Sequence, residues 1–436
     1  MRKRLLLQGI ILCLACLLFG ASAKAAPRLQ KTKDPVILVL DPGHGGENNG
    51  TEEGLFLEKD MTLATARVIE KELSQYEGIK VYLTRGDDTD LTLKERAQFA
   101  ESVNADFLVS VHYNASESHQ LFGAEVWISL IPEYHAQGYQ LATAFLREYR
   151  DMGVFIRGIK TRRHSKGNDY YGVIRESVTL GIPALIIEHC HVDHPLDREF
   201  CDTTEDWEAF GKADAIAIAK YFGLKSSSLG VDYSADAQLL PEVTKNQLID
   251  RAMQDQTEPT YCHITLKEAK YDEDYVSVYL SGDDPDSNLI YYAVSFDGGE
   301  TFGSGIPLEG VDILTGEHPD SFLIEIEVPD GTSPSLALRV SNPYDLDCVS
   351  NVLTFDQSFQ KPVPSIEEEK PAISEVSMDP KAPEEDGQDA SKAKLHRVIG
   401  IVCTAVGLIL LVTILLCLLL GTKKQPNNAR KEHETR

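Results

Sequence analysis

Two histidines and one glutamate in the N-terminal part of the chain have the residue types of a metal-dependent hydrolase. His44 lies in the glycine-flanked segment 41–46, Asp-Pro-Gly-His-Gly-Gly, which directly follows an apolar run. Glu58 comes fourteen residues later, and His112 ends the apolar stretch 107–112. Two imidazoles and one carboxylate form a three-ligand zinc set that leaves a fourth position open for water. The sequence therefore predicts a catalytic zinc ion (Zn2+) bound by His44, Glu58 and His112, rather than a structural zinc.

Hydrolysis at such a centre also needs a group that moves protons, and Glu188 is the candidate. It directly follows the apolar run 181–187. A carboxylate at the end of a buried strand is costly unless it is paired or used, and burial raises its pKa toward neutrality. The alternative is a structural glutamate that caps a helix or forms a salt bridge.

The elements that must position these residues are short apolar runs separated by helical patterns. Strands are predicted at 36–40, 81–84, 107–112, 124–129 and 184–187, and apolar residues recur at helical spacing within 63–73 and 93–103. Continuous apolar runs fit strands that are covered on both faces. Residues 36–224 are therefore predicted to form one α/β domain. Ligands of such sheets gather beyond the carboxyl ends of the strands, where His44 and His112 fall.

The second half of the ectodomain has a different periodicity. Residues 225–257 form a polar connector, and from 258 to 357 apolar residues alternate with polar ones between Gly, Asp and Pro turn signals. This pattern predicts a small, immunoglobulin-like, all-β sandwich.

The two ends of the chain predict a membrane protein. Residues 1–25 have the basic start, apolar core and small-residue end of a signal peptide. Residues 398–420 carry no charge, and as a transmembrane helix they would rise about 35 Å, enough to span a hydrocarbon core of about 30 Å. Between the ectodomain and this helix, residues 358–394 are predicted to be a disordered, acidic, Pro-rich stalk. Residues 421–436 form a basic tail on the cytoplasmic side.

Charge and cysteine content add two constraints. The formal net charge of −26 argues against a nucleic-acid partner. Of the eight cysteines, four lie in the predicted ectodomain, namely Cys190, Cys201, Cys262 and Cys348. They either pair within each domain, 190 with 201 and 262 with 348, or remain buried free thiols.

The region from 36 to about 215 resembles the zinc-dependent N-acetylmuramoyl-L-alanine amidases whose amidase_3-like catalytic domain opens with Asp-x-Gly-His-Gly-Gly. The motifs that carry the resemblance stand in the family's order and spacing: Asp41 to Gly46, Glu58-Lys59-Asp60, Thr84-Arg85-x-x-Asp88, Leu93-x-x-Arg96, Ser110-Val111-His112-x-Asn114-Ala115, Arg157-Gly158-Ile159-Lys160, and Ile182 to Glu188. The resemblance implies a three-layer catalytic domain with a mostly parallel or mixed sheet. It also implies His44, Glu58 and His112 as zinc ligands and Glu188 as the catalytic glutamate.

By the same resemblance, the substrate is peptidoglycan and the scissile bond joins the lactyl group of N-acetylmuramic acid to L-alanine. The enzyme would then sit in a bacterial cell membrane as a single-pass protein, with its catalytic domain outside the cytoplasm and its C-terminal helix in the cytoplasmic membrane. Two alternatives are a catalytically inactive surface protein with binding or regulatory function, and a zinc peptidase that acts on stem peptides. The residues do not identify the substrate contacts or the partner of the β-sandwich.

The sequence departs from the family pattern at residues 47–51 and 189–194. The second segment contains His189, Cys190, His191 and His194. These residues either hold a second metal ion or, more simply, line the pocket beside Glu188.

Overall fold

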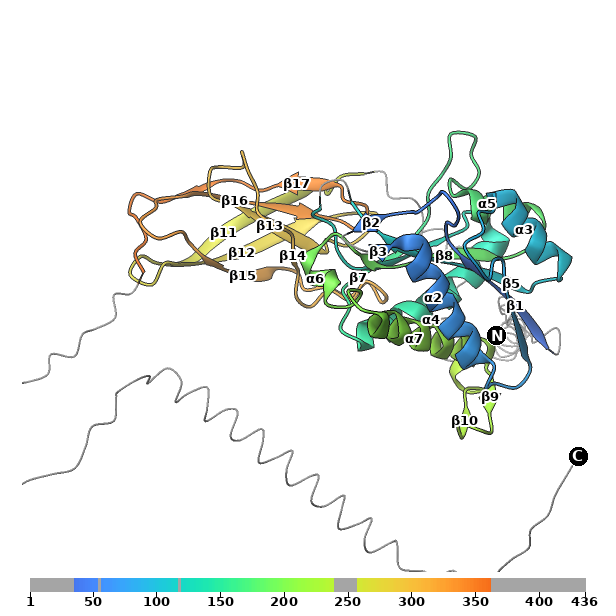
Figure 1. Cartoon of the computed structure of the whole chain (residues 1–436). Helices are drawn as coiled ribbons and strands as arrows, with labels where there is room; N and C mark the ends of the chain where they lie inside the picture. Colours follow the sequence, from blue (N-terminus) through green and yellow to red (C-terminus); the bar gives the residue numbers. More distant parts are fainter. Residues whose placement is uncertain (1–34, 54–55, 117–118, 239–256, 362–436) are drawn as a thin grey trace, which may run out of the picture. The chain divides into compact units, whose positions relative to one another are not determined.

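The computed structural model describes residues 35–53, 56–116, 119–238 and 257–361 (Figure 1). The predicted signal peptide 1–25, transmembrane helix 398–420 and basic tail 421–436 lie outside the described residues, as does the stalk beyond residue 361. Within the described ranges, no helix combines the length and apolarity that a membrane span requires.

Residues 36–224, the predicted catalytic domain, are built on a six-stranded mixed sheet. Its strand order is β4-β1-β5-β8-β6-β7, where β1 is Val36–Pro42, β4 Ile79–Leu83, β5 Phe107–Asn114, β6 Ala124–Ile128, β7 Ile156–Lys160 and β8 Ala184–His191. The first four strands of this order run parallel, while β6 is antiparallel to β8 and parallel to β7. The mixed sheet confirms the predicted fold. No apolar run predicted β7, because it carries Arg157 and Lys160.

Helices cover both faces of this sheet (Figure 1). One face packs against α2 (Glu58–Leu73), α4 (Pro132–Asp151) and α7 (Thr204–Phe222), and the other against α3 (Leu93–Ser102) and α5 (Gly172–Thr179). Each interface has its own hydrophobic cluster, the larger one around Phe107, Phe145 and Phe210 and the smaller one around Ile174 and Ile186. The domain therefore has three layers, as predicted.

Local signals account for the ends of two of these helices. Thr92 and Glu95 form a reciprocal capping box at the start of α3, and Thr203 and Asp206 form another at the start of α7. Gly223 ends α7 in the left-handed conformation, which glycine adopts without steric cost.

Short elements complete the catalytic domain and the connector. They are the hairpin of β2 (Glu52–Glu53) and β3 (Phe56–Leu57), α6 (Pro195–Arg198), the hairpin of β9 (Lys225–Ser226) and β10 (Val231–Asp232), and the 3-10 helix η1 (Asp236–Gln238). The structure does not describe the connector at residues 239–256.

The predicted all-β region is present as two antiparallel sheets. One contains β11 (Tyr261–Lys270), β12 (Tyr275–Asp283) and β15 (Phe322–Glu327); the other contains β14 (Ile306–Pro307), β13 (Tyr291–Ser295), β16 (Ser335–Ser341) and β17 (Asp347–Val349), with β18 (Leu353–Thr354) paired to β16. Alternate residues from both sheets form one hydrophobic cluster. Phe359 is fully buried in that cluster, and its backbone bonds to Gly331 and Thr332. The sandwich therefore continues past residue 357, where the sequence placed its end.

The four cysteines predicted to lie outside the cytoplasm form two neighbouring pairs of free thiols. Burial, followed by the adjacent Cys201 thiol, raises the pKa of Cys190. Burial and the adjacent Cys348 thiol raise the pKa of Cys262 to about 12. We call Cys190 with Cys201 the catalytic-domain thiol pair, and Cys262 with Cys348 the sandwich thiol pair. Both pairs join the same cysteines that the sequence suggested as partners, and in this structure all four are free thiols.

Candidate active site

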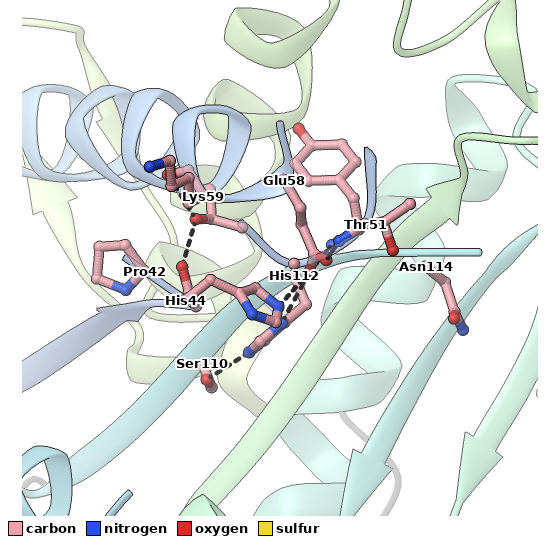
Figure 2. Close-up of polar contacts among 12 residues, drawn as sticks. Pro42, His44, Thr51, Glu58, Lys59, Ser110, His112 and Asn114 are labelled. Atoms are coloured by element: carbon pink, nitrogen blue, oxygen red, sulfur yellow. Dashed lines mark hydrogen bonds and ion pairs between the residues drawn. The ribbon is translucent and has the colours of Figure 1, made fainter. Parts of the chain in front are cut away.

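The three predicted zinc ligands converge from three separate elements. His44 follows β1, Glu58 is the first residue of α2, and His112 lies in β5. One ligand atom of each lies within 4.8 Å of the other two. His44 Nε2 is 3.1 Å from Glu58 Oε1, and His112 Nδ1 is 3.0 Å from the same oxygen (Figure 2). The structure thus brings together the set that the sequence predicted.

Glycines make room for this convergence. A Cβ atom on Gly43 would lie 2.2 Å from Cε1 of His112, and one on Gly50 would lie 2.5 Å from Oε2 of Glu58. His44 itself has a φ of 62°, which turns the chain sharply after β1. Larger side chains at Gly43 or Gly50 would therefore displace a ligand, and the cradle requires glycine at both positions.

Hydrogen bonds orient both imidazole rings for metal binding. Nδ1 of His44 donates to Oδ1 of Asn48 over 3.0 Å, so its Nε2 carries the lone pair that faces Glu58. Nε2 of His112 donates to Oγ of Ser110 over 3.2 Å, and Ser110 donates to Oδ2 of Asp41 over 2.8 Å. An acceptor on the far nitrogen fixes the tautomer that a metal-ligating histidine needs.

Glu58 is oriented in the same way. Its Oε2 accepts a hydrogen bond of 2.8 Å from the backbone N–H of Thr51, which leaves Oε1 facing the two histidines. The ligand atoms, the hydrogen bonds that orient them and the room left by the glycines are all present. The residues therefore fit a zinc ion with two nitrogen ligands and one oxygen ligand.

Two buried arginines hold the backbone around His44. Arg96 donates to Asp41 Oδ1 and to the carbonyls of Pro42 and His44, each over 2.8 Å. Arg85 donates to the carbonyls of Pro42 and Gly43 over 3.0 and 2.8 Å. Both arginines belong to the sequence motifs that carry the family resemblance, but no role was predicted for them. The signal was their charge at positions next to apolar strands, where an unpaired arginine would be costly.

The ligand set is strongly polarised. Burial alone would raise the pKa of Glu58, but hydrogen bonds from His112 and His44 outweigh it and hold that pKa well below its usual range. Burial alone would lower the pKa of His44, but the hydrogen bond and charge of Glu58 raise it. The carboxylate of Glu58 thus favours positive charge at the point where the two histidines converge, which is the place that a metal cation would take.

Glu188 lies beside this centre because of the register of the sheet. His112 of β5 is paired with Glu188 of β8, and Glu188 is paired with Glu125 of β6. Residues paired directly across neighbouring strands point to the same face. The three side chains therefore form a row on the α3/α5 face of the sheet, at the carboxyl ends of β5 and β8.

The environment of Glu188 favours its protonated form. Its Oε2 atom is buried and has no hydrogen-bond partner among the described residues. Burial, followed by the negative charges of Glu58 and Glu125, raises the pKa of Glu188 well above its ordinary value. A helix-capping or salt-bridged glutamate would have a partner at this atom, so the structural alternative finds no support here.

The histidines that follow Glu188 are separated rather than clustered. A register shift in the pairing of β5 with β8, between His112 and Asn114, directs His189 and His191 to opposite faces. His189 is fully buried in the larger core, bonded to the carbonyl of His112 and to Asp214 Oδ2, each over 2.9 Å. His191 bonds to the carbonyl of Gly123 and lines a pocket. Over the described ranges, His44, Glu58 and His112 are the one cluster with metal-binding geometry, so these histidines form no second site.

A cavity of about 630 Å³ opens onto the ligand set. His44, His112 and Asn48 line one side of it, and Arg175 and Glu176 of α5 line another. A second pocket, of about 360 Å³, lies beside Glu125. The row of His112, Glu188 and Glu125 therefore runs from one hollow toward the other.

Comparison with known proteins identifies a family for this region. Residues 38–220 match the model of the Amidase_3 family, described as N-acetylmuramoyl-L-alanine amidase. The N-acetylmuramoyl-L-alanine amidase CwlM of Bacillus licheniformis is 29% identical over 196 residues, which are 44% of this chain and 71% of that protein. The probable cell wall amidase LytH of Staphylococcus aureus is 32% identical over 174 residues, 38% of this chain and 53% of LytH. The chain thus spans about half the length of that relative.

Solved structures give similar matches. The catalytic domain of CwlV, an N-acetylmuramoyl-L-alanine amidase from Bacillus (Paenibacillus) polymyxa var. colistinus, is 28% identical, with a TM-score of 0.39 over 44% of this chain and 99% of that one. Cwp6 from Clostridium difficile is 31% identical, with a TM-score of 0.39 over 42% of this chain and 28% of Cwp6. The family match and the named relatives show that this chain contains an Amidase_3 domain, described as N-acetylmuramoyl-L-alanine amidase, over residues 38–220.

Proposed function

We propose that this chain is a membrane-anchored, zinc-dependent amidase that hydrolyses the bond between N-acetylmuramic acid and L-alanine in peptidoglycan. The family and the named relatives support the amidase class. The observation that carries the site is the convergence of His44 Nε2, Glu58 Oε1 and His112 Nδ1 beside Glu188, whose buried Oε2 has no hydrogen-bond partner among the described residues.

The chemistry divides between the metal and the protein. When bound by His44, Glu58 and His112, zinc would polarise the scissile carbonyl and lower the pKa of the attacking water. Glu188 would lose its own proton more readily beside a bound cation and could then accept the proton of that water. As the carbon–nitrogen bond breaks, Glu188 returns this proton to the alanine nitrogen, so one group serves as base and then as acid. Asn48 and Ser110 keep both imidazoles in the required orientation.

The predicted ends of the chain supply the proposed location. A signal peptide at 1–25 and a transmembrane helix at 398–420 would place the catalytic domain outside the cytoplasm and hold it at the bacterial membrane. A coil of the length of residues 362–394, which follow the described part of the sandwich, would span about 30 Å on average. Peptidoglycan within this reach would be the substrate.

Product analysis separates this proposal from the two alternatives. Purified ectodomain is incubated with isolated peptidoglycan, with and without a chelator, and the products are analysed by mass spectrometry. Stem peptides with a free L-alanine amino terminus, formed only without chelator, identify the amidase. Cuts within the stem peptide would identify a peptidase instead, and the absence of any product from zinc-loaded protein would identify an inactive binding protein.

The metal assignment has its own test. His112→Ala removes one of three ligands, so this variant should lose both bound zinc and activity, measured by elemental analysis and by product formation. The matched control is His263→Ala, which changes an exposed histidine of the β-sandwich. Full zinc content in His112→Ala would contradict the ligand assignment.

A further inference from the structure

The β-sandwich contributes directly to a pocket next to the active site. Catalytic domain and sandwich lie within one compact unit. The loop Asn342–Leu346, which we call the junction loop, connects β16 to β17 and contacts the catalytic domain. Its Asp345 Oδ1 lies 2.5 Å from Nη2 of Arg157, and the hydroxyl of Tyr344 accepts a hydrogen bond of 3.3 Å from the backbone N–H of Thr161.

The junction loop is internally rigid. Oδ1 of Asn342 accepts hydrogen bonds from the backbone N–H groups of Tyr344 and Leu346, over 2.9 and 3.1 Å. Asn342 is fully buried and donates to Asp284 over 3.0 Å. A loop held in this way presents a fixed surface to its neighbour.

This loop closes one side of the pocket of about 360 Å³. Tyr344 and Leu346 form the sandwich side, while Glu125, His191 and Arg162 belong to the catalytic domain. Glu125 is the third member of the row that begins at His112 and passes through Glu188. The pocket therefore starts where this row ends.

The distance from the metal ligands matches a short peptide. Two strand spacings separate Glu125 from His112, or about 10 Å. An extended peptide advances about 3.3–3.6 Å per residue. A group bound in this pocket would then belong to the second to fourth residue from the scissile amide.

The charges of the pocket leave one cation available. Arg157 and Lys160 are buried and paired with Glu125 and Asp345. Arg162 is exposed and has no carboxylate partner among the described residues; its guanidinium stacks 3.8 Å from the ring centre of Tyr170. Stacking uses the face of this guanidinium and a hydrogen bond to Tyr171 uses part of its N–H edge, and the remaining N–H groups can bind a carboxylate.

His191 supplies an acceptor to the same pocket. Its Nδ1 donates to the carbonyl of Gly123 over 3.1 Å, so its Nε2 carries a lone pair. Burial, together with the charge of Arg157, lowers the pKa of His191 to about 4, and the ring is neutral at physiological pH. The pocket thus combines a cationic donor, a neutral acceptor and the apolar walls of Tyr344 and Leu346.

We propose that this junction pocket binds the carboxylate-bearing peptide portion of the substrate, and that the β-sandwich thereby takes part in substrate selection. The inference rests on the proposed amidase function. The cavity of about 630 Å³ on the other side of the ligand set is larger and is left for the glycan. In this arrangement, Arg162 binds a carboxylate close to the scissile amide, and His191 accepts a peptide N–H.

The test compares two soluble substrates in the zinc-loaded ectodomain. One is N-acetylmuramoyl-L-alanyl-D-glutamic acid, and the other is the same compound with both carboxyl groups amidated. Arg162→Gln should raise KM for the acid about tenfold or more, since a charge-assisted hydrogen bond is lost, and leave KM for the amidated compound unchanged. Arg163→Gln, at the neighbouring exposed arginine outside the pocket, is the matched control.

Two further variants test the acceptor and the sandwich wall. His191→Asn keeps a donor for the Gly123 carbonyl but removes the acceptor at Nε2, so it should raise KM for both compounds. Leu346→Ser should do the same through the junction loop, whereas Leu323→Ser, at an exposed leucine of β15, should not. Unchanged KM in both pocket variants would overturn the role of the sandwich.

Peptide binding separates this inference from the proposed function. The dipeptide L-alanyl-D-glutamic acid is titrated into wild-type protein and Arg162→Gln by calorimetry. Binding that weakens about tenfold in the variant supports the pocket, whether or not the substrates are cleaved. Failure to cleave either substrate would contradict only the amidase proposal. Cleavage with equal KM for acid and amide, and binding unaffected by Arg162→Gln, would refute the inference and leave the amidase function standing.

Discussion

Glu188→Gln should change how the stability of the metal-free protein depends on pH. Glutamine has nearly the shape of a protonated glutamic acid but cannot ionise. Burial and the charges of Glu58 and Glu125 raise the pKa of Glu188 well above its ordinary value of 4.5. The folded wild-type protein therefore keeps a proton on this side chain over a pH range in which the unfolded chain has released it.

The sign and size of the effect follow from this difference. Above pH 4.5, the folded state binds one more proton than the unfolded state, so the free energy of unfolding of the wild type falls as pH rises. The slope is about 1.4 kcal/mol per pH unit until the folded-state pKa is reached. Glu188→Gln lacks this term. As the pH rises above 4.5, the variant should therefore gain stability relative to the wild type until the folded-state pKa of Glu188 is reached.

Urea unfolding at several pH values, with chelator present, measures this difference. Chelator is needed because a cation bound beside Glu188 would favour the ionised form of its carboxylate. The pH range over which the wild type and the variant differ would then be narrower. Glu300→Gln, at an exposed glutamate of the sandwich, is the control; it retains Glu188 and should show the same pH dependence as the wild type. A pH-independent difference between Glu188→Gln and wild type would refute the idea that Glu188 is held protonated.

The same variant tests catalysis when zinc is restored. Glu188→Gln should keep its zinc but lose about 10²–10⁴-fold in turnover, because the amide cannot carry the proton. A variant that retains more than about a tenth of the wild-type rate would show that another group serves as the base. His191 is the nearest candidate for that group in the sequence. Its Nδ1 is bonded to the carbonyl of Gly123, and its ring faces the junction pocket.

Three further predictions concern the two described domains. Asp345→Asn should lower the free energy of unfolding by about 2–3 kcal/mol in urea, because buried Arg157 loses one of its two charge partners; no change would mean that the ion pair is immaterial. A chain cut after residue 355 loses Phe359 from the sandwich core and should be about 3–5 kcal/mol less stable than one cut after residue 361. Equal stability would show that the sandwich ends earlier, as the sequence suggested. Under oxidising conditions, peptide mapping should find disulfides only within the catalytic-domain thiol pair and the sandwich thiol pair; any crossed linkage would contradict the described packing.

Much of the site could be predicted from the sequence because its signals are local. The turn after β1 needs glycines around His44, and these residues stand together in the chain. Residue type then indicates the ligands, since two histidines and a carboxylate suit zinc. The continuous apolar runs likewise indicate β1, β5 and β8, because strands covered on both faces have few polar positions. Glu188 stood out for the same reason, as a charge that ends such a run.

The tertiary structure decided what depends on register and on contacts between distant segments. Glu188 lies beside His112 only through the pairing of β5 with β8, and one shift in that pairing sends His189 into the core and His191 to the active-site face. Side chains alternate faces along a strand, so a shift of one residue reverses their direction. The pocket closed by the junction loop was equally hidden, because Arg157 and Asp345 are 188 residues apart in the chain. Composition and periodicity describe each segment alone, whereas this contact exists only once both domains have folded against each other.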